Sequence, residues 1–217
     1  MRVRLSLLTV LCGAALLVAP QSVVRMQAQD GWIPLFDGKT LDGWKVGENA
    51  STFSVQDGAI VVFGPRAHLY YAGPVENHTF KDFEWKADVM TYPGANSGMY
   101  FHTEYQEGGW PQKGYEVQVN NSHTDPIRTG SLYNIVNVMN VAPANDHEWF
   151  TQHVIVQGKK VTIKVNGKTT VEYTEPADVT RPADMKGRLI SQGTFALQGH
   201  DPKSRVHYRN LAVKPLK

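Results

Sequence analysis

Cysteine is almost absent from this sequence, which contains one cysteine, Cys12, in 217 residues. Cys12 lies inside an apolar N-terminal run, and Leu11 precedes it where a lipid-modified cysteine would follow a small residue. A lipid anchor is therefore not expected. Beyond this run the chain can form neither disulfides nor thiolate metal sites.

A strong charge of either sign is also missing, because 22 Lys and Arg residues are offset by 20 Asp and Glu residues. The basic residues form no run, so the charge pattern does not favour a nucleic-acid partner. No window shows an apolar stripe at the 3.6-residue spacing of an amphipathic helix. These absences argue against a helical protein and against a nucleic-acid-binding protein.

The N-terminus has the pattern of a secretory signal peptide. Arg2 and Arg4 precede an apolar run over residues 5–19, which is shorter than the ~20 residues that span a bilayer. Ala28 is a small residue suited to cleavage, so we expect residues 1–28 to be removed. The alternative is an uncleaved anchor. Residues 29–217 then form a single domain of a secreted or periplasmic bacterial protein, with no transmembrane segment after cleavage.

Period-two alternation of apolar and polar residues dominates the rest of the chain. It predicts strands within residues 54–63, 83–90, 96–104, 114–123, 153–173, 194–199 and 206–216. Turn pairs interrupt two of these segments, at Asp57-Gly58, Gly158-Lys159 and Asn166-Gly167. Many short strands without helices predict an all-β protein, an antiparallel sandwich or barrel. Two long polar segments, 103–114 and 120–134, are the expected binding loops.

The strand at 114–123 has an unusual polar face. Its odd-numbered side chains, Tyr115 to Val119, are expected in the core, while Glu116, Gln118 and Asn120 point the other way. Asn is depleted in strands, and amides offer a donor and an acceptor to the hydroxyls of a sugar. An ordinary solvated face is the alternative.

The segment 96–104 shows the same division. One side carries Asn96, Gly98, Tyr100 and His102, and the other is apolar. Gly98 is expected to keep the surface low so that a ligand can approach. His102 is then expected at the edge of the groove, with a plain surface histidine as the alternative.

Four segments resemble the 3-keto-disaccharide hydrolase domain family. They are GWIPLFDGKTLDGW (31–44), NSGMYFHTEYQEGGWPQKGYEVQVNN (96–121), RTGSLYNIV (128–136) and FALQGHDPKSRVHYRNLAVKPL (195–216). The resemblance implies a concanavalin A-like jelly-roll sandwich of two antiparallel sheets with a concave binding face. It also implies cleavage of glycosides whose C3 hydroxyl has been oxidised to a ketone, and therefore an enzyme that acts after a sugar 3-dehydrogenase.

A conventional glycosidase needs two carboxylates, whereas this strand offers Glu116 alone. A ketone at C3 acidifies the C2–H bond, so a base can remove that proton and the C1 substituent can leave by β-elimination, followed by addition of water. Direct hydrolysis stays open as an alternative. Glu116, His200 and His102 are the predicted catalytic residues. The predicted substrate-binding residues are Gln118, Asn120, Asn96, Tyr100, Trp110, His123, Arg128, Tyr133 and Gln198.

No cofactor is required by these residues, although a divalent metal ion would stabilise an enolate. Its candidate ligands are Glu116, His102, His123 and His200, but no compact zinc-binding spacing is present. The predicted partner is a small carbohydrate. Two other readings are open: a non-catalytic lectin-like module on the same fold, and a structural or protein-binding sandwich.

Overall fold

The computed structural model describes residues 29–217, and the expected signal peptide, residues 1–28, lies outside them. None of the helices among the described residues is long and apolar enough to cross a membrane. Helical structure in this part of the chain is confined to four 3-10 turns, η1 (Gln29–Gly31), η2 (Ala50–Thr52), η3 (Val75–His78) and η4 (Ala183–Met185). The absence of an amphipathic stripe in the sequence agrees with this architecture.

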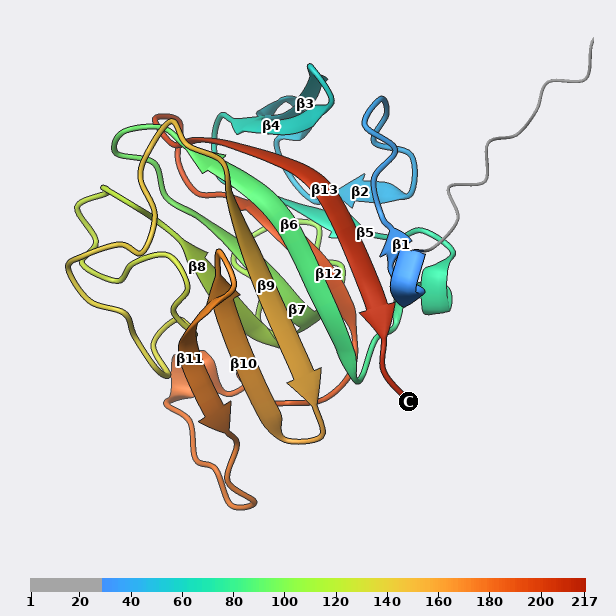
Figure 1. Ribbon diagram of the computed structural model, residues 1–217, viewed down its shortest axis with the longest axis vertical. Coiled ribbons are helices and arrows are strands. Elements are labelled where there is room, and N and C mark those ends of the chain that lie inside the picture. The colour runs from blue at the N-terminus through green and yellow to red at the C-terminus, as the bar shows by residue number, and fades with distance from the viewer. Residues whose placement is uncertain (1–28) are drawn as a thin grey trace, which may run out of the picture.

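The larger of two antiparallel sheets has eight strands in the order β11-β10-β9-β6-β13-β4-β3, with β1 paired to β13 (Figure 1). Its strands are β1 (Ile33–Pro34), β3 (Phe53–Gln56), β4 (Ala59–Phe63), β6 (Phe83–Thr91), β9 (Phe150–Gln157), β10 (Lys160–Val165), β11 (Lys168–Thr174) and β13 (Arg205–Pro215). The predicted turns at 57–58, 158–159 and 166–167 each join two of them, as predicted. Asn166 and Gly167 both have positive φ, which suits an Asn-Gly hairpin.

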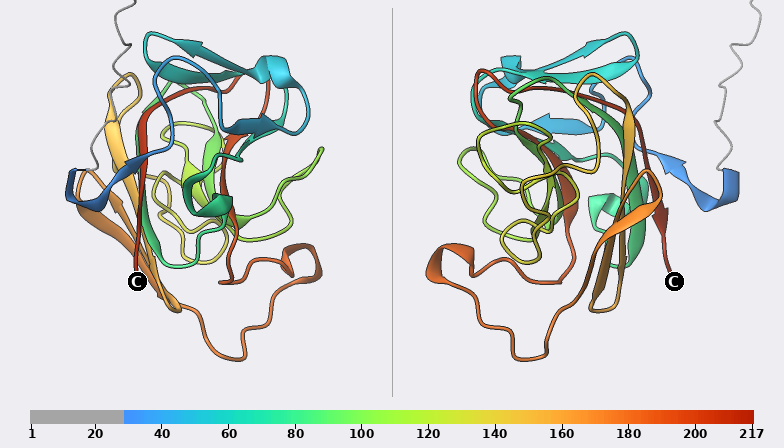
Figure 2. Two further views of the ribbon diagram at one scale, coloured as in Figure 1. Left: turned by 90° about the vertical axis from the view of Figure 1, so that its right-hand side faces the viewer. Right: turned by 60° about the vertical axis from the view of Figure 1, so that its left-hand side comes forward.

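The smaller sheet has five strands in the order β2-β5-β12-β7-β8. They are β2 (Trp44–Val46), β5 (Ala67–Tyr71), β7 (Ser97–Thr103), β8 (Tyr115–Val119) and β12 (Thr194–Gly199). The two sheets pack face to face (Figures 1 and 2), so the predicted concanavalin A-like sandwich is confirmed.

The core lies between the sheets and follows the alternation predicted from the sequence. Along β6, every second residue from Phe83 to Thr91 is buried and the others are half-exposed. Trp85 on β6 stacks on Phe195 of β12 with 4.3 Å between ring centroids. The apolar side of β8, from Tyr115 to Val119, belongs to the same buried cluster, as expected.

The smaller sheet is buried on both faces, which the sequence did not indicate. All residues of β7, β8 and β12 are buried. Long connections cover the outer face, and Figure 2 shows the yellow-green chain between β8 and β9 gathered beside the sheet. The polar face of β8 is therefore not an open groove but the floor of a partly enclosed space.

Candidate active site

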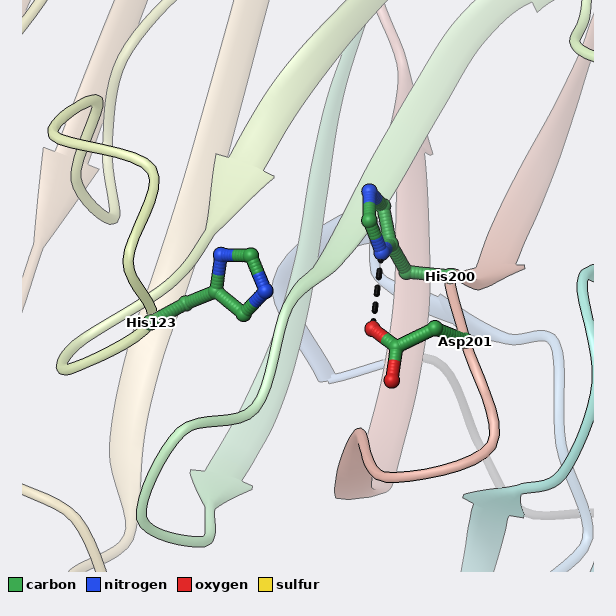
Figure 3. Close-up of side chains that lie close together, drawn as sticks. All are labelled: His123, His200 and Asp201. Carbon is green, nitrogen blue, oxygen red and sulfur yellow. Dashed lines mark hydrogen bonds and ion pairs between the residues drawn. The ribbon is translucent and has the colours of Figure 1, made fainter.

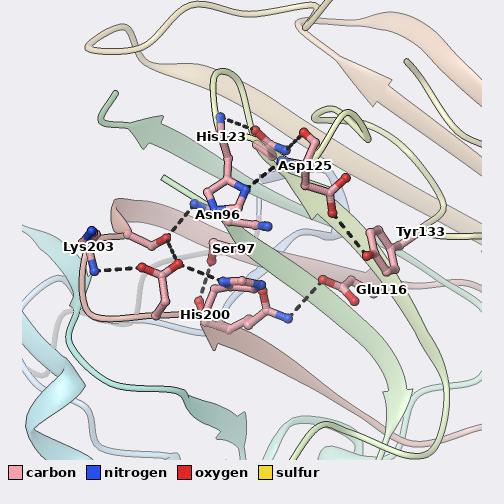
Figure 4. Close-up of polar contacts among 12 residues, drawn as sticks. Asn96, Ser97, Glu116, His123, Asp125, Tyr133, His200 and Lys203 are labelled. Atoms are coloured by element: carbon pink, nitrogen blue, oxygen red, sulfur yellow. Dashed lines mark hydrogen bonds and ion pairs between the residues drawn. The ribbon is translucent and has the colours of Figure 1, made fainter. Parts of the chain in front are cut away.

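A cavity of about 230 Å³ opens on the outer face of the smaller sheet. Its floor comes from the adjacent strands β12, β7 and β8, and its walls come from the connections that cover them. Figure 4 shows part of this space, with Glu116, Tyr133 and His200 on different segments of the chain. The lining residues are Asn96, Tyr100, Trp110, Glu116, Gln118, Tyr133, Arg188, Gln198 and His200.

Glu116 supplies the carboxylate at the cavity floor. The Tyr100 hydroxyl donates to its Oε2 at 2.6 Å, and the Gln198 amide donates to its Oε1 at 3.1 Å. A Cβ added to Gly98 would lie 2.5 Å from Oε1. Gly98 therefore makes room for the Glu116 side chain, and the expectation that it also leaves the surface low for a ligand stays a prediction.

Arg188 places a cation beside this carboxylate. Its Nη2 atom lies 3.6 Å from Oε2 of Glu116, and its side chain is only 13% exposed. Burial raises the pKa of Glu116, while the charge of Arg188 and the hydrogen bonds from Tyr100 and Gln198 oppose that rise. A carboxylate with a raised pKa is a better proton acceptor than an exposed one.

Several polar atoms around the cavity lack a partner within the described protein. They are Oδ1 of Asn96, Oε1 of Gln118, Oε1 of Gln198 and Nη1 of Arg188. All four residues line the cavity. Buried polar groups are nearly always hydrogen-bonded, so these atoms are suited to meet the hydroxyl or carbonyl groups of a ligand.

His200 reaches the cavity from the end of β12 and is oriented by its neighbour Asp201. The two side chains meet at 2.8 Å between Nδ1 and Oδ2 (Figure 3). Although burial acts to raise it, hydrogen bonds from Ser204 and His200 lower the pKa of Asp201 to about 2. The ionised Asp201 therefore accepts the Nδ1 proton of His200 and leaves Nε2 for chemistry.

One cluster has separations that a metal ion could bridge. A donor atom from each of His123, His200 and Asp201 lies within 4.8 Å of the others (Figure 3). However, the Asp125 amide donates to Nδ1 of His123 at 3.0 Å. Because Nδ1 accepts this proton, the ring carries its own proton on Nε2, and burial, followed by the charge of His200, lowers the pKa of His123. That nitrogen has no lone pair for a metal, and the donors in this arrangement do not fit one.

His102 does not reach the cavity, and its expected position at the groove edge is wrong. Its φ of +56° interrupts the alternation of β7, where the register with β12 also shifts. The imidazole instead packs 5.6 Å from Phe83, on the core side. Its Nε2 lies 2.8 Å from the Lys81 carbonyl, and its Nδ1 accepts the Ser191 amide proton. Burial lowers the pKa of His102 to about 4, so it is a neutral structural residue.

Asn120 and Arg128, both predicted to bind substrate, hold the long connection after β8 instead. The Asn120 amide donates to the Asp125 carbonyl, and its Oδ1 accepts from Arg128 and from the backbone of His123. Arg128 also donates to the carbonyls of His123 and Asp125. Neither side chain lines the cavity. Their hydrogen bonds are used within the loop, so they shape the wall on which Tyr133 sits. His123 lies just outside the lining, with its ring 5.6 Å from that of His200.

The other predicted residues do surround the cavity: Asn96, Tyr100, Trp110, Glu116, Gln118, Tyr133, Gln198 and His200. Trp110 is 44% exposed and lies 5.4 Å from the His200 ring, a position suited to stacking on a sugar. Arg188 was not predicted. It lies in a long connection without strand periodicity, so no sequence pattern indicates it. Its role is visible only from its half-buried position next to Glu116 in the structure.

Comparison with known proteins agrees with this architecture. The family model of the 3-keto-alpha-glucoside-1,2-lyase-like domain matches residues 31–214. A 3-keto-disaccharide hydrolase of Bacteroides thetaiotaomicron is 26% identical over 233 residues, covering 86% of this chain and 79% of that protein.

Two solved structures share the fold. One, from Parabacteroides distasonis and provisionally assigned as a glycosyl hydrolase, has a TM-score of 0.72 at 23% identity and covers 86% of this chain and 94% of its own. The other, the carbohydrate-binding module CBM66 of Bacillus subtilis, has a TM-score of 0.57 at 11% identity and covers 79% and 95%. At these identities the likeness shows the fold alone.

Proposed function

The chain belongs to the 3-keto-alpha-glucoside-1,2-lyase-like domain family, and from this premise we propose that it cleaves glycosides whose sugar carries a ketone at C3. The supporting observation is a single buried carboxylate paired with a half-buried cation. Among the described residues, Glu116 is the one acidic side chain that lines the cavity. A conventional glycosidase uses two, whereas an elimination needs one base and a stabiliser for an enolate.

The size and chemistry of the cavity suit one sugar ring. Its volume of about 230 Å³ is below the ~300–1,000 Å³ of pockets that enclose drug-sized ligands. The unpartnered atoms of Asn96, Gln118 and Gln198 can accept hydrogen bonds from sugar hydroxyls. Trp110 at the rim can cover the ring. The leaving group then extends out of the cavity.

The side chains around Glu116 suit the atoms on either side of C2 in the substrate. Arg188 approaches Oε2 of Glu116, and Gln198 approaches Oε1, with His200 two residues beyond Gln198 on the chain. In a 3-keto-glycoside, C2 lies between the carbons that carry O3 and the glycosidic oxygen. We therefore assign Arg188 to O3, Glu116 to C2–H and His200 to the glycosidic oxygen.

The reaction proceeds in two balanced steps. Glu116 takes the C2 proton, and the electron pair forms an enolate whose charge on O3 is stabilised by the cation of Arg188. The C1–O bond breaks, C1=C2 forms, and His200, acting as an imidazolium whose Nδ1 proton lies on Asp201, gives its Nε2 proton to the departing oxygen. Water then adds across the enone, with hydroxyl to C1 and a proton to C2, and the sum is hydrolysis. The substrate must come from an oxidation at C3, the reaction of a sugar 3-dehydrogenase.

A lectin-like module is the second candidate, because the unpartnered polar atoms and exposed Trp110 would bind a sugar equally well without turnover. The location outside the cytoplasm, in the periplasm or medium, remains a prediction from the N-terminal pattern. Both readings predict binding of a sugar, and only the enzyme reading predicts exchange at C2.

Incubation of the purified protein with a 3-keto-glucoside in deuterated water tests the proposal. We expect cleavage with deuterium at C2 of the released sugar, and a primary isotope effect with substrate deuterated at C2. The same glucoside with an intact C3 hydroxyl should not react. Cleavage with neither exchange nor an isotope effect would favour direct displacement. Binding without any cleavage would favour the lectin.

A further inference from the structure

The connection from β11 to β12, here called the strap (residues 176–193), carries Arg188. It leaves the larger sheet, passes η4, and enters the smaller sheet across one end of the sandwich, where Figure 2 shows it in orange. Long connections are usually mobile, yet Arg188 must stay within ångströms of Glu116 to stabilise charge there. The strap must therefore be held in place by contacts with the rest of the protein.

Glu175 anchors the strap where it begins. Its side chain is 1% exposed, and Lys159 meets its Oε1 at 2.7 Å. Its Oε2 accepts from the Tyr115 hydroxyl at 2.5 Å and from the backbone amide of Ile190 at 2.7 Å. Burial acts to raise its pKa, but the hydrogen bonds from Lys159, Tyr115 and Ile190 lower it. The Glu175 carboxylate thus holds the strap two residues after Arg188.

Arg181 secures the strap from the other side of Arg188. Its Nη2 donates to the hydroxyls of Tyr115 at 2.7 Å and Tyr173 at 2.8 Å. Its Nε donates to the backbone carbonyl of Arg188 at 2.9 Å. The carbonyl of Arg188 is therefore tied through one side chain to two tyrosines on strands β8 and β11.

Three backbone contacts complete the attachment. The Ser191 amide donates to His102, and the Gly114 amide donates to the Gly187 carbonyl. Gly187 packs so closely on the Gln112 carbonyl that a Cβ has no space. The segments on both sides of Arg188 are thus fixed, while the Arg188 side chain points into the cavity with Nη1 unpartnered.

Strand β8 connects both halves of the site. Tyr115 holds Glu175 and Arg181 beneath the strap, and the next residue, Glu116, faces Arg188 in the cavity. We infer that Glu175 and Arg181 are positioning residues, which act through the strap to hold the Arg188 cation against the Glu116 carboxylate. The inference rests on the proposed role of Arg188 in stabilising an enolate.

Glu175→Gln and Arg181→Gln test the inference, each made in the native chain and in an Arg188→Met background. Glu172→Gln is the matched control, because Glu172 is an exposed residue of β11 paired only with Lys160. In the native background we expect kcat to fall about ten- to hundredfold, as for misplacement by about 1 Å, with the control unchanged. In the Arg188→Met background neither substitution should reduce kcat further.

The pKa of Glu116, followed by carbon-13 NMR of its carboxyl group, gives a readout that needs no turnover. The charge of Arg188 lowers the pKa of Glu116, so Glu175→Gln and Arg181→Gln should each raise that pKa. Arg188→Met should also raise it, and the double variants should show no further change. If the protein fails to cleave 3-keto-glycosides, the proposed function falls while this titration still decides the positioning. A Glu116 titration identical to the native one in both variants, or kcat losses that multiply with that of Arg188→Met, would overturn the inference. If Glu175→Gln does not fold, the same kinetics and titration of Arg181→Gln, at a half-buried residue, decide the inference.

Discussion

Tyr100 and Glu116 are direct partners across β7 and β8, and the Tyr100 hydroxyl donates a 2.6 Å hydrogen bond to Oε2 of Glu116. Directly opposed residues on one face of a sheet bring their side chains together. The pair fixes the carboxylate at the cavity floor, where Gln198 donates to both members. The orientation of the proposed base is therefore set by the sheet and not by a mobile loop.

Glu116→Gln should abolish most turnover while leaving binding largely intact. The amide keeps the size of the carboxylate but cannot accept the C2 proton, so we expect kcat to fall about 10²- to 10⁴-fold. Steady-state kinetics with a 3-keto-glucoside and calorimetric binding of the unoxidised glucoside are the measurements. Glu172→Gln, at an exposed position of β11, should behave as the native protein. Equal losses in affinity and turnover would instead indicate a lectin-like site.

Asp201→Asn should impair catalysis by releasing the orientation of His200. The carboxylate accepts the Nδ1 proton of His200 and so stabilises the imidazolium that donates from Nε2. An amide that presents its NH₂ group there would favour the neutral ring with its proton on Nε2, which is a much weaker acid. We expect kcat to fall about tenfold or more with little change in KM, and nitrogen-15 NMR of the ring should show the altered tautomer.

Asp37→Asn is the matched control for Asp201→Asn. Asp37 also caps a turn, accepting from the backbone of Lys39 and Thr40 and from the Thr40 hydroxyl, but it does not line the active-site cavity. Its substitution should cost some stability and no activity. An unchanged His200 tautomer in Asp201→Asn would show that the aspartate serves the turn alone.

Most strands and the polar face of β8 could be predicted because alternation is a local property, whereas β1, β2 and β5 lie outside the predicted segments. Successive side chains on a strand point to opposite faces, so Val117 faces the core and its neighbours Glu116 and Gln118 face away. The same alternation can be seen directly in the sequence. The eight predicted residues that line the cavity lie on such strands or in loops next to them. Parity indicated those on β7 and β8, whereas the family resemblance indicated Gln198 and His200.

The errors arise where position depends on distant chain segments. Parity along β7 predicts His102 in the groove, but its positive φ and the register shift beside it turn the ring to the core side. Arg188 reaches Glu116 across 72 residues of sequence through a strap that is fixed by tertiary hydrogen bonds. No local pattern encodes these contacts, and the covering of the smaller sheet follows from the same long connections.

His102 should make the stability of the protein dependent on pH in mildly acidic solution. Burial lowers its pKa from 6.5 to about 4. Between these two pH values His102 is protonated in the unfolded chain and neutral in the folded chain. Its contribution to stability is complete above pH 6.5 and is lost progressively as the pH falls to about 4. The shift corresponds to about 3 kcal/mol.

The measurement is the free energy of unfolding in urea between pH 7 and 4, for the native protein and for His102→Asn. Asparagine tolerates the positive φ and its oxygen can accept the Ser191 amide proton. The variant should be less stable at pH 7, because it loses the contact with Lys81, and its stability should decline less steeply. If the stability of the two proteins fell equally with pH, protonation of His102 would not destabilise the native fold.

Gly98→Ala should lower kcat by displacing the Glu116 carboxylate. The new Cβ would lie 2.5 Å from Oε1 and 2.9 Å from Cγ of Glu116, closer than packed atoms approach. The Glu116 side chain is the part that can move, so we expect kcat to fall at least about tenfold, whereas a blocked ligand approach would raise KM at constant kcat. In the Glu116→Gln background the alanine should add little further loss, because the base is already gone. Multiplying losses in the double variant would mean that Gly98 serves the substrate directly, independently of the carboxylate it accommodates.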